Sequence, residues 1–139
     1  MTMKSRTIEI GQIYRIKADE KNDITPKTGM LFRPKFYVVM GFDNLGNVYG
    51  GVVFDSDINR NFVSHDFEDF FLPISCSKYH FLDHDSYIDC RRMKPSTLEK
   101  LLEGEFCGII AENDFANIIK LLRMSPRETY VHLKSFGII

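Results

Sequence analysis

The sequence lacks the features that mark several large classes of protein. No apolar stretch approaches the ~18 residues that a membrane-spanning helix requires, and the first residues hold no apolar signal-peptide core. The three cysteines, Cys76, Cys90 and Cys107, cannot all pair within one chain, which excludes a fully paired disulfide framework. We therefore expect a cytoplasmic protein with free thiols and no membrane partner.

Several catalytic motifs and a strong net charge are absent as well. The chain has no glycine-rich phosphate loop, no G-x-S-x-G elbow and no H-E-x-x-H helix. Its 18 basic and 19 acidic residues leave a net charge of −1, which excludes a strongly basic nucleic-acid coat. The 12 Phe and 6 Tyr residues, with no Trp, are expected mostly in the core.

The charges are unevenly distributed along the chain. Residues 1–40 hold eight basic and four acidic residues, residues 41–90 hold two and nine, and residues 91–139 hold eight and six. This pattern predicts a polyanion near the N-terminal third, with the acidic middle segment facing elsewhere. The alternative is chance variation on a solvated surface.

The 139 residues, 44% of them hydrophobic and 27% charged, indicate one folded domain over 1–139. A long polar loop is expected at 18–31, and a turn cluster at 43–47 predicts a hairpin. The pair Gly50-Gly51 indicates a bulge or a sharp bend. Alternation and apolar runs predict strands at 8–17, 35–42, 48–54, 70–74 and 87–91, with Pro73 placing the fourth at a sheet edge.

The last third of the chain carries helix signals. Ser96–Glu99 and Ser125–Glu128 fit capping boxes, and Gly104 fits a C-terminal cap. They predict helices at 97–103 and 126–135, and apolar spacing predicts another at 112–123, with a brief strand at 106–110. The fold class is therefore α+β: a small, strongly bent barrel over about 8–91, followed by a helical part over about 95–136.

Two residues of the predicted hairpin are candidates for phosphate chemistry. Arg33 precedes a buried strand, and an arginine fork at a strand entrance can clamp a phosphate or steady a phosphorane-like transition state. Ser56 follows the second hairpin strand, where a hydroxyl can hydrogen-bond a phosphate. The alternatives are a solvent-facing arginine and a serine that closes a turn.

Four possible metal ligands fall within fifteen residues. Cys76, His80, His84 and Cys90 supply the donors of a Cys₂His₂ zinc site, although their spacing is not that of a zinc finger or ribbon. A structural or partner-facing segment is the alternative, and the chain gives no other sign of a metal or cofactor.

Four segments, taken in order, carry a resemblance to a known family: GQIYRI at 11–16, RPKFYVVM at 33–40, YIDCRRM at 87–93, and the spacing of Leu98, Gly104, Asp114 and Ile118. They resemble the PemK/MazF (CcdB-like) toxin family. One is similar to the family's opening strand, one to its R-P strand and one to its late strand, and the tail is similar to its helix-and-strand ending. The resemblance covers about residues 9–123.

The resemblance implies an SH3-like barrel with short C-terminal helices and a toxin of a toxin–antitoxin system. It implies a metal-independent endoribonuclease that acts on single-stranded RNA, as a homodimer with an antitoxin-like protein partner. Arg33 and Ser56 match the family's catalytic positions, and no cofactor is implied. We expect Lys27, Lys35 and Arg15 to contact the RNA backbone.

Two departures keep an alternative open. The family's usual Ser or Thr directly after the R-P strand is Gly41 here, and the acidic middle segment is heavier than an RNA groove favours. The alternative is a non-catalytic binding module of the same fold, which acts on a protein partner or is neutralised by one.

Overall fold

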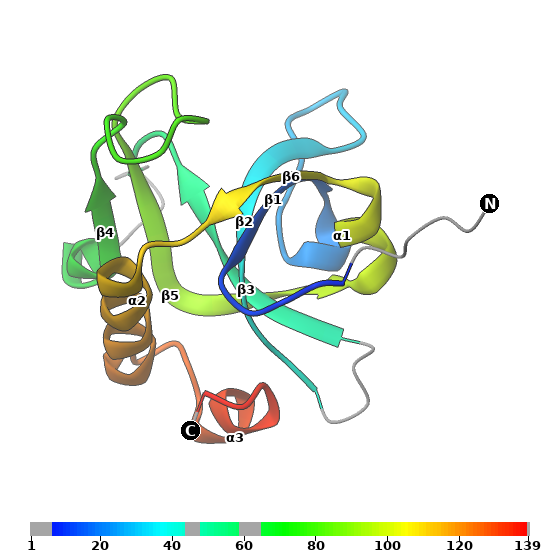
Figure 1. Cartoon of the computed structure of the whole chain (residues 1–139). Helices are drawn as coiled ribbons and strands as arrows, with labels where there is room; N and C mark the ends of the chain where they lie inside the picture. Colours follow the sequence, from blue (N-terminus) through cyan, green and yellow to red (C-terminus); the bar gives the residue numbers. More distant parts are fainter. Residues whose placement is uncertain (1–6, 44–47, 59–64, 139) are drawn as a thin grey trace.

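Neighbouring strands of the sheet are antiparallel throughout the described chain. The computed structural model describes residues 7–43, 48–58 and 65–138, and within them the fold is α+β, built on a six-stranded curled sheet (Figure 1). The strand order is β4-β5-β3-β2-β1-β6. The strands are β1 Gln12–Ala18, β2 Arg33–Phe42, β3 Val48–Asp55, β4 Phe71–Ile74, β5 Ser86–Thr97 and β6 Glu105–Ile109.

The strands agree with the sequence-based expectations in kind, with one large difference in length. The hairpin of β2 and β3 is confirmed, and β4, which contains Pro73, lies at the sheet edge as predicted. Most of the predicted turn, residues 44–47, lies outside the described residues. β5 was predicted to end at residue 91, but it continues to Thr97 because its second half pairs with β3 as far as Val48.

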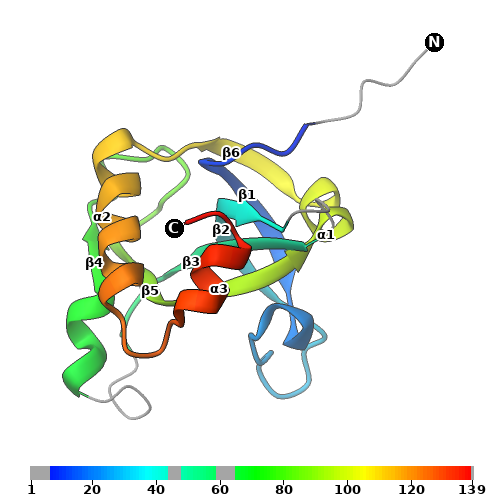
Figure 2. The same cartoon turned by 90° about the horizontal axis from the view of Figure 1, so that it is seen from below.

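The helices lie on different sides of the sheet. α2 packs beside β4 and β5, α1 lies at the opposite side of the molecule, and α3 lies below the sheet (Figures 1 and 2). The predictions for the first two helices are confirmed to within a residue or two. The elements are α1 Leu98–Glu103, α2 Glu112–Met124, α3 Tyr130–Ser135, and the 3₁₀ turns η1 Glu20–Asn22 and η2 His65–Phe70.

Both predicted capping boxes are wrong. Thr97, not Ser96, caps α1 by accepting the Lys100 N–H at 3.2 Å. At the second box, the Ser125 hydroxyl donates to the Arg91 carbonyl of β5, and the Glu128 carboxylate accepts a backbone N–H of the same strand. Because these two side chains are engaged by β5, α3 begins only at Tyr130, after the cap Thr129.

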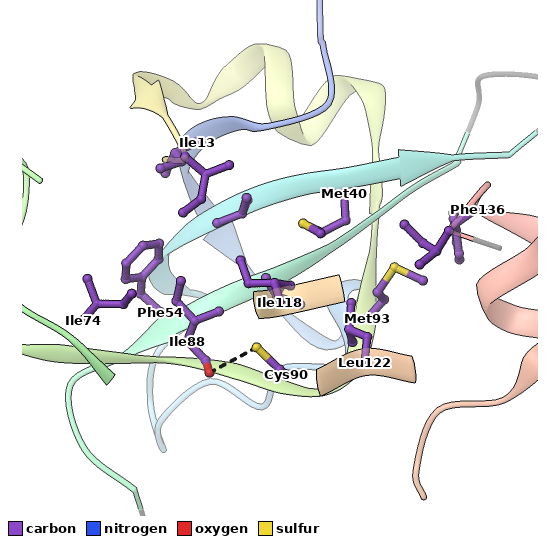
Figure 3. Packing of buried hydrophobic residues seen from close by; sticks show 14 of the residues in the cluster. Ile13, Met40, Phe54, Ile74, Ile88, Cys90, Met93, Ile118, Leu122 and Phe136 are labelled. Carbon is purple, nitrogen blue, oxygen red and sulfur yellow. Dashed lines mark hydrogen bonds between the residues drawn. The ribbon is translucent and has the colours of Figure 1, made fainter. Parts of the chain in front are cut away.

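Apolar side chains cover both faces of the sheet. The larger cluster lies between the sheet and α2 and α3, and Figure 3 shows Met93, Ile118, Leu122 and Phe136 gathered within it. The smaller cluster lies on the other face and includes Leu101 of α1. Its buried members are Ile8, Tyr14, Ile16, Ala18, Ile24, Tyr37, Val39, Tyr49, Val53 and Leu101.

The C-terminal segment explains the glycines of the hairpin. Phe136 lies across β2 and β3, so that a side chain at Gly41 would overlap the Phe136 carbonyl oxygen. A Cβ at Gly50 would lie only 2.9 Å from the Phe136 ring. The sheet register shifts at the same place, between Val39 and Gly41, which confirms the predicted bulge. Close packing therefore requires glycine at both positions.

Replacing Gly50 should test this packing. We expect Gly50→Ala to lower the free energy of unfolding by about 1–3 kcal/mol, because the new methyl group overlaps the Phe136 ring. In a Phe136→Ala background, the same change should cost less than about 0.5 kcal/mol. Urea denaturation measures both values.

Gly41→Ala is the matched control. Its overlap is with the Phe136 backbone, so its cost should persist in the Phe136→Ala background. Equal costs of Gly50→Ala in the two backgrounds would show that the ring does not set the size of residue 50.

Candidate functional site

Antiparallel pairing of β2 with β3 gathers the two predicted phosphate-binding residues in one pocket. Tyr37 pairs with Val53, so the start of β2 lies beside the end of β3. Arg33 and Ser56 line this pocket, which has a volume of about 230 Å³ and is called the Arg33 pocket below. Its other lining residues are Pro34, Lys35, Phe36, Phe54, Asp55, Phe81, Leu82, Asp83, His84 and Ser86.

The functional groups of Arg33 and Ser56 are available to a ligand. Across the described residues, no carboxylate forms an ion pair with the Arg33 guanidinium, which is half-buried at the start of β2. Ser56 is exposed. A half-buried guanidinium and a hydroxyl that line the same pocket are suited to bind an oxyanion, because both can donate hydrogen bonds to it.

Lys35 lies in the same pocket, but an acid already compensates its charge. Its ammonium forms an ion pair with Asp55, and the side chains are 11% and 23% exposed respectively. The acidic middle segment was expected to face away from the basic N-terminal third, and this expectation is wrong. Strand pairing places Asp55 against Lys35, and Asp83 also lines the pocket, so its formal charges nearly balance.

His84 is a pocket residue that the sequence suggested as a metal ligand and, from its flanking acids Asp83 and Asp85, as a candidate for acid–base chemistry. Its Nδ1 lies 3.0 Å from the carbonyl oxygen of Asp85. Because a carbonyl oxygen can only accept, Nδ1 is the donor of this hydrogen bond, and Nε2 is the ring nitrogen left to face a ligand. In the sequence, only the acids on either side of His84 hinted at a role in acid–base chemistry. Residue spacing does not predict the path of the loop that brings His84 beside β2 and β3.

The apolar wall of the pocket is aromatic. Phe81 lies 4.6 Å from Phe36 and 5.7 Å from Phe54 between ring centroids. The segment that carries Phe81 is held to α2 by Tyr79, whose hydroxyl donates to Asp114 and accepts the Ala111 N–H. This anchoring positions the His84 side of the pocket.

Lys27 and Arg15, the other predicted RNA contacts, line neighbouring recesses. Lys27 shares one with Phe32, Arg33 and Pro34. Arg15 lines another with Lys17, Phe32, Pro34 and Lys100. Because Pro34 borders all three hollows, the predicted residues surround one stretch of surface, although no single pocket contains all of them. Lys100 is bound to Asp19 at 2.9 Å and lowers the pKa of that carboxyl.

The four predicted zinc ligands do not converge. No group of three or more His, Cys, Asp or Glu side chains within the described part of the chain is arranged to hold a metal ion. Cys90 is buried in the larger core cluster, where its Sγ contacts the Ile88 carbonyl (Figure 3). The zinc-site hypothesis is therefore wrong, because β5 turns Cys90 into the core while Cys76 and both histidines stay on the adjoining loop.

Comparison with protein-family models finds no family that matches the sequence, and a search of curated proteins finds none that matches it. Among the helices of the described residues, none is long and apolar enough to cross a membrane.

The thiols provide a test of this arrangement. Under native conditions Cys76 should react first with a disulfide reagent, since Cys90 and Cys107 are buried. The pKa of all three thiols is raised, that of Cys76 by its hydrogen bond with Asp85 and those of the other two by burial, so exposure decides the order. We expect the other two to react only at the rate of unfolding, in a stopped-flow thiol titration. Fast modification of Cys90 would contradict the core position assigned to it.

Tyr79 predicts a pH dependence of stability. Burial, and then its hydrogen bond to Asp114, raise the pKa of Tyr79 from 10.0 to about 12. Its stabilising contribution is therefore complete below pH 10 and is lost as the pH rises through about 12. Tyr79→Phe should cost about 1–3 kcal/mol at pH 7 by leaving Asp114 and the Ala111 N–H short of a partner.

The matched measurement is urea denaturation of wild type and Tyr79→Phe from pH 7 to 12. The difference between their free energies of unfolding should shrink above pH 10, whereas a constant difference would exclude this linkage.

Proposed function

We propose that the chain is a metal-independent endoribonuclease that acts on single-stranded RNA, with the Arg33 pocket as its active site. The observation that carries the proposal is the convergence of Arg33, Lys35 and Ser56 with His84 where β2 begins and β3 ends. The proposal includes the SH3-like barrel of the PemK/MazF family, with which the curled antiparallel sheet and short helices are compatible.

The reaction uses the RNA's own 2′-hydroxyl as the nucleophile. The 2′-oxygen forms a bond to the adjacent phosphorus while the bond from phosphorus to the 5′-oxygen breaks. The products are a 2′,3′-cyclic phosphate and a 5′-hydroxyl, and no water is consumed in this step. Holding the reacting atoms in line supplies much of the acceleration.

Each pocket residue has a distinct role in this scheme. Arg33 donates to the non-bridging oxygens as negative charge develops on the phosphorane, and Ser56 positions the same phosphate. His84 Nε2 accepts the 2′-hydroxyl proton, and the resulting imidazolium can return a proton to the leaving 5′-oxygen. Phe36 and Phe81 offer an apolar face on which a base can stack.

The surrounding basic residues attract the RNA strand. Lys27 and Arg15 are exposed on the recesses that border Pro34, where they can contact flanking phosphates. Lys35 acts mainly through its ion pair, which fixes Asp55 in the pocket lining.

The resemblance adds two partners to the proposal: a second copy of the chain and a small antitoxin-like protein. Exposed apolar side chains beside the edge strand β6, Ile10 and Ile109 among them, are available for such a partner.

One observation favours the alternative of a non-catalytic binding module. The close approach of Phe136 forces glycine at position 41, so the hydroxyl that the family usually carries there cannot be accommodated. Such a module of the same fold would act on a protein partner or be neutralised by one, without cutting RNA.

Cleavage of a synthetic single-stranded RNA tests the proposal. We expect Arg33→Gln to lower the cleavage rate by about 10²–10³-fold, because one donor to the transition-state oxyanion is lost. Ser56→Ala should lower it as well, while added EDTA should have no effect. Gel analysis of end-labelled RNA, with a substrate that carries 2′-deoxyribose at the cut site, measures the rate and confirms the nucleophile.

Lys120→Gln, an exposed position on α2, is the control for loss of one positive charge. An unchanged rate in Arg33→Gln, or a rate that falls equally in Lys120→Gln, would contradict the assignment of Arg33.

A further inference from the structure

An irregularity in β5 gathers basic side chains away from the Arg33 pocket. Val53 pairs with Asp89 and Gly51 with Lys94, so two residues along β3 correspond to five along β5. The extra residues of β5 bulge from the ladder, and bulges re-aim side chains that alternation would otherwise send to opposite faces. Arg91, Arg92 and Lys94 consequently line one hollow.

This hollow, called the Lys94 pocket below, has an excess of positive charge. It has a volume of about 250 Å³ and is lined by four cationic side chains and two carboxylates. The Arg33 pocket, by comparison, contains equal numbers of each kind apart from His84. The residues of the Lys94 pocket are Asp23, Asp89, Arg91, Arg92, Met93, Lys94 and Arg127.

Arg91 is held rigidly at the pocket wall. Its Nε and Nη2 donate to the two carboxylate oxygens of Asp89 at 3.0 and 2.8 Å, and its guanidinium lies 4.8 Å from the centre of the Phe71 ring. These contacts use two of its five N–H donors. The remaining donors are thus presented in a fixed orientation.

Lys94 places an ammonium without a direct ion-pair partner in the same pocket, although the carboxylates of Asp89 and Asp23 act on it from a longer distance. Its Nζ donates to the backbone carbonyl of Asp23 at 3.3 Å, and none of the ion pairs found among the described residues includes it. Burial lowers the pKa of Lys94, which means that its charge is poorly solvated. The Tyr37 hydroxyl donates to the Lys94 carbonyl at 2.6 Å and fixes the backbone there.

Arg127 closes the pocket from the C-terminal part of the chain. The turn that carries it is fastened to β5 by the Ser125 hydroxyl and the Glu128 carboxylate. In the predicted capping box, the same two side chains would have bonded the backbone N–H groups at the start of their own helix. Their engagement with β5 therefore brings a fourth cation to the bulge.

We infer that the Lys94 pocket binds a phosphoryl group through Lys94, Arg127 and the free donors of Arg91 and Arg92. The negative charge of a phosphoryl group would offset the cationic excess, and its oxygens would accept hydrogen bonds from these side chains. The group can be a free phosphate monoester or a backbone phosphate of a nucleic acid, since the recognising chemistry is the same. The inference is independent of RNA cleavage, because none of these residues lines the Arg33 pocket.

Nuclear magnetic resonance titration of the full chain tests the site with inorganic phosphate at constant ionic strength. We expect saturable shifts of the Arg91–Lys94 and Arg127 amides in the wild type. Lys94→Met and Arg127→Gln should each weaken binding at least tenfold, and Lys120→Gln should stay within twofold of wild type. Arg127 is exposed, so this variant keeps the test valid even if Lys94→Met fails to fold.

A single-stranded DNA oligonucleotide and a phosphate monoester, ribose 5-phosphate, distinguish the two sources. The DNA lacks a 2′-hydroxyl and cannot be cut by the proposed reaction, so failure of the nuclease proposal leaves this result intact. If DNA shifts the same amides with a salt dependence that weakens in Arg127→Gln, the source is a strand; if only the monoester does, it is a free phosphate. Phosphate shifts that ignore both substitutions, or no saturable shifts, would overturn the inference.

Discussion

The antiparallel register of β2 with β3 is the constraint on which the site depends. It brings the start of one strand beside the end of the other, so that Arg33 and Ser56 meet although they are far apart in the sequence. The ion pair of Lys35 with Asp55 bridges the same strand ends and holds them together. A shift of one residue in the pairing register of either strand would turn its side chains to the opposite face of the sheet, and the pocket would no longer form.

Glycine at three positions of the hairpin makes this register possible. Gly41 and Gly50 admit the C-terminal segment around Phe136, and Gly51 leaves space for the Tyr37 ring, since a Cβ there would lie 2.6 Å from it. Tyr37 in turn reaches across to the Lys94 carbonyl. These glycines thus couple the packing on the two faces of the sheet, with Phe136 on one face and Tyr37 on the other. The same coupling links the irregularity of β5 to the hairpin that carries the Arg33 pocket.

Local patterns predicted the hairpin, the edge position of β4, the bulge and the helices α1 and α2. They failed where a partner distant in sequence decides the outcome. Glu128 fits a capping box by its spacing, but its carboxylate binds β5 instead, and β5 itself extends past its apolar residues because β3 pairs with it. The Cys and His residues seemed suited to zinc because spacing alone does not tell which cysteine faces the core.

The candidate site was predictable only in part. Arg33 and Ser56 came from short motifs, and hairpin pairing placed them together. His84 and the compensating Asp55 could not be assigned, because one depends on a folded loop and the other on the cross-strand neighbour of Lys35. Nothing in the sequence indicated that the residues of the Lys94 pocket lie together, apart from the net positive charge of the last third of the chain. An irregular stretch of β5 brings them together, and no local pattern predicts it.

Induced expression in a bacterial host, with primer extension on total RNA, tests the central claim most directly. The wild-type chain should arrest growth and produce discrete RNA ends, and both effects should vanish in Arg33→Ala while the variant stays soluble and folded. Arrest without new RNA ends, or normal growth with soluble wild-type protein, would contradict RNA cleavage at the Arg33 pocket and favour the binding module.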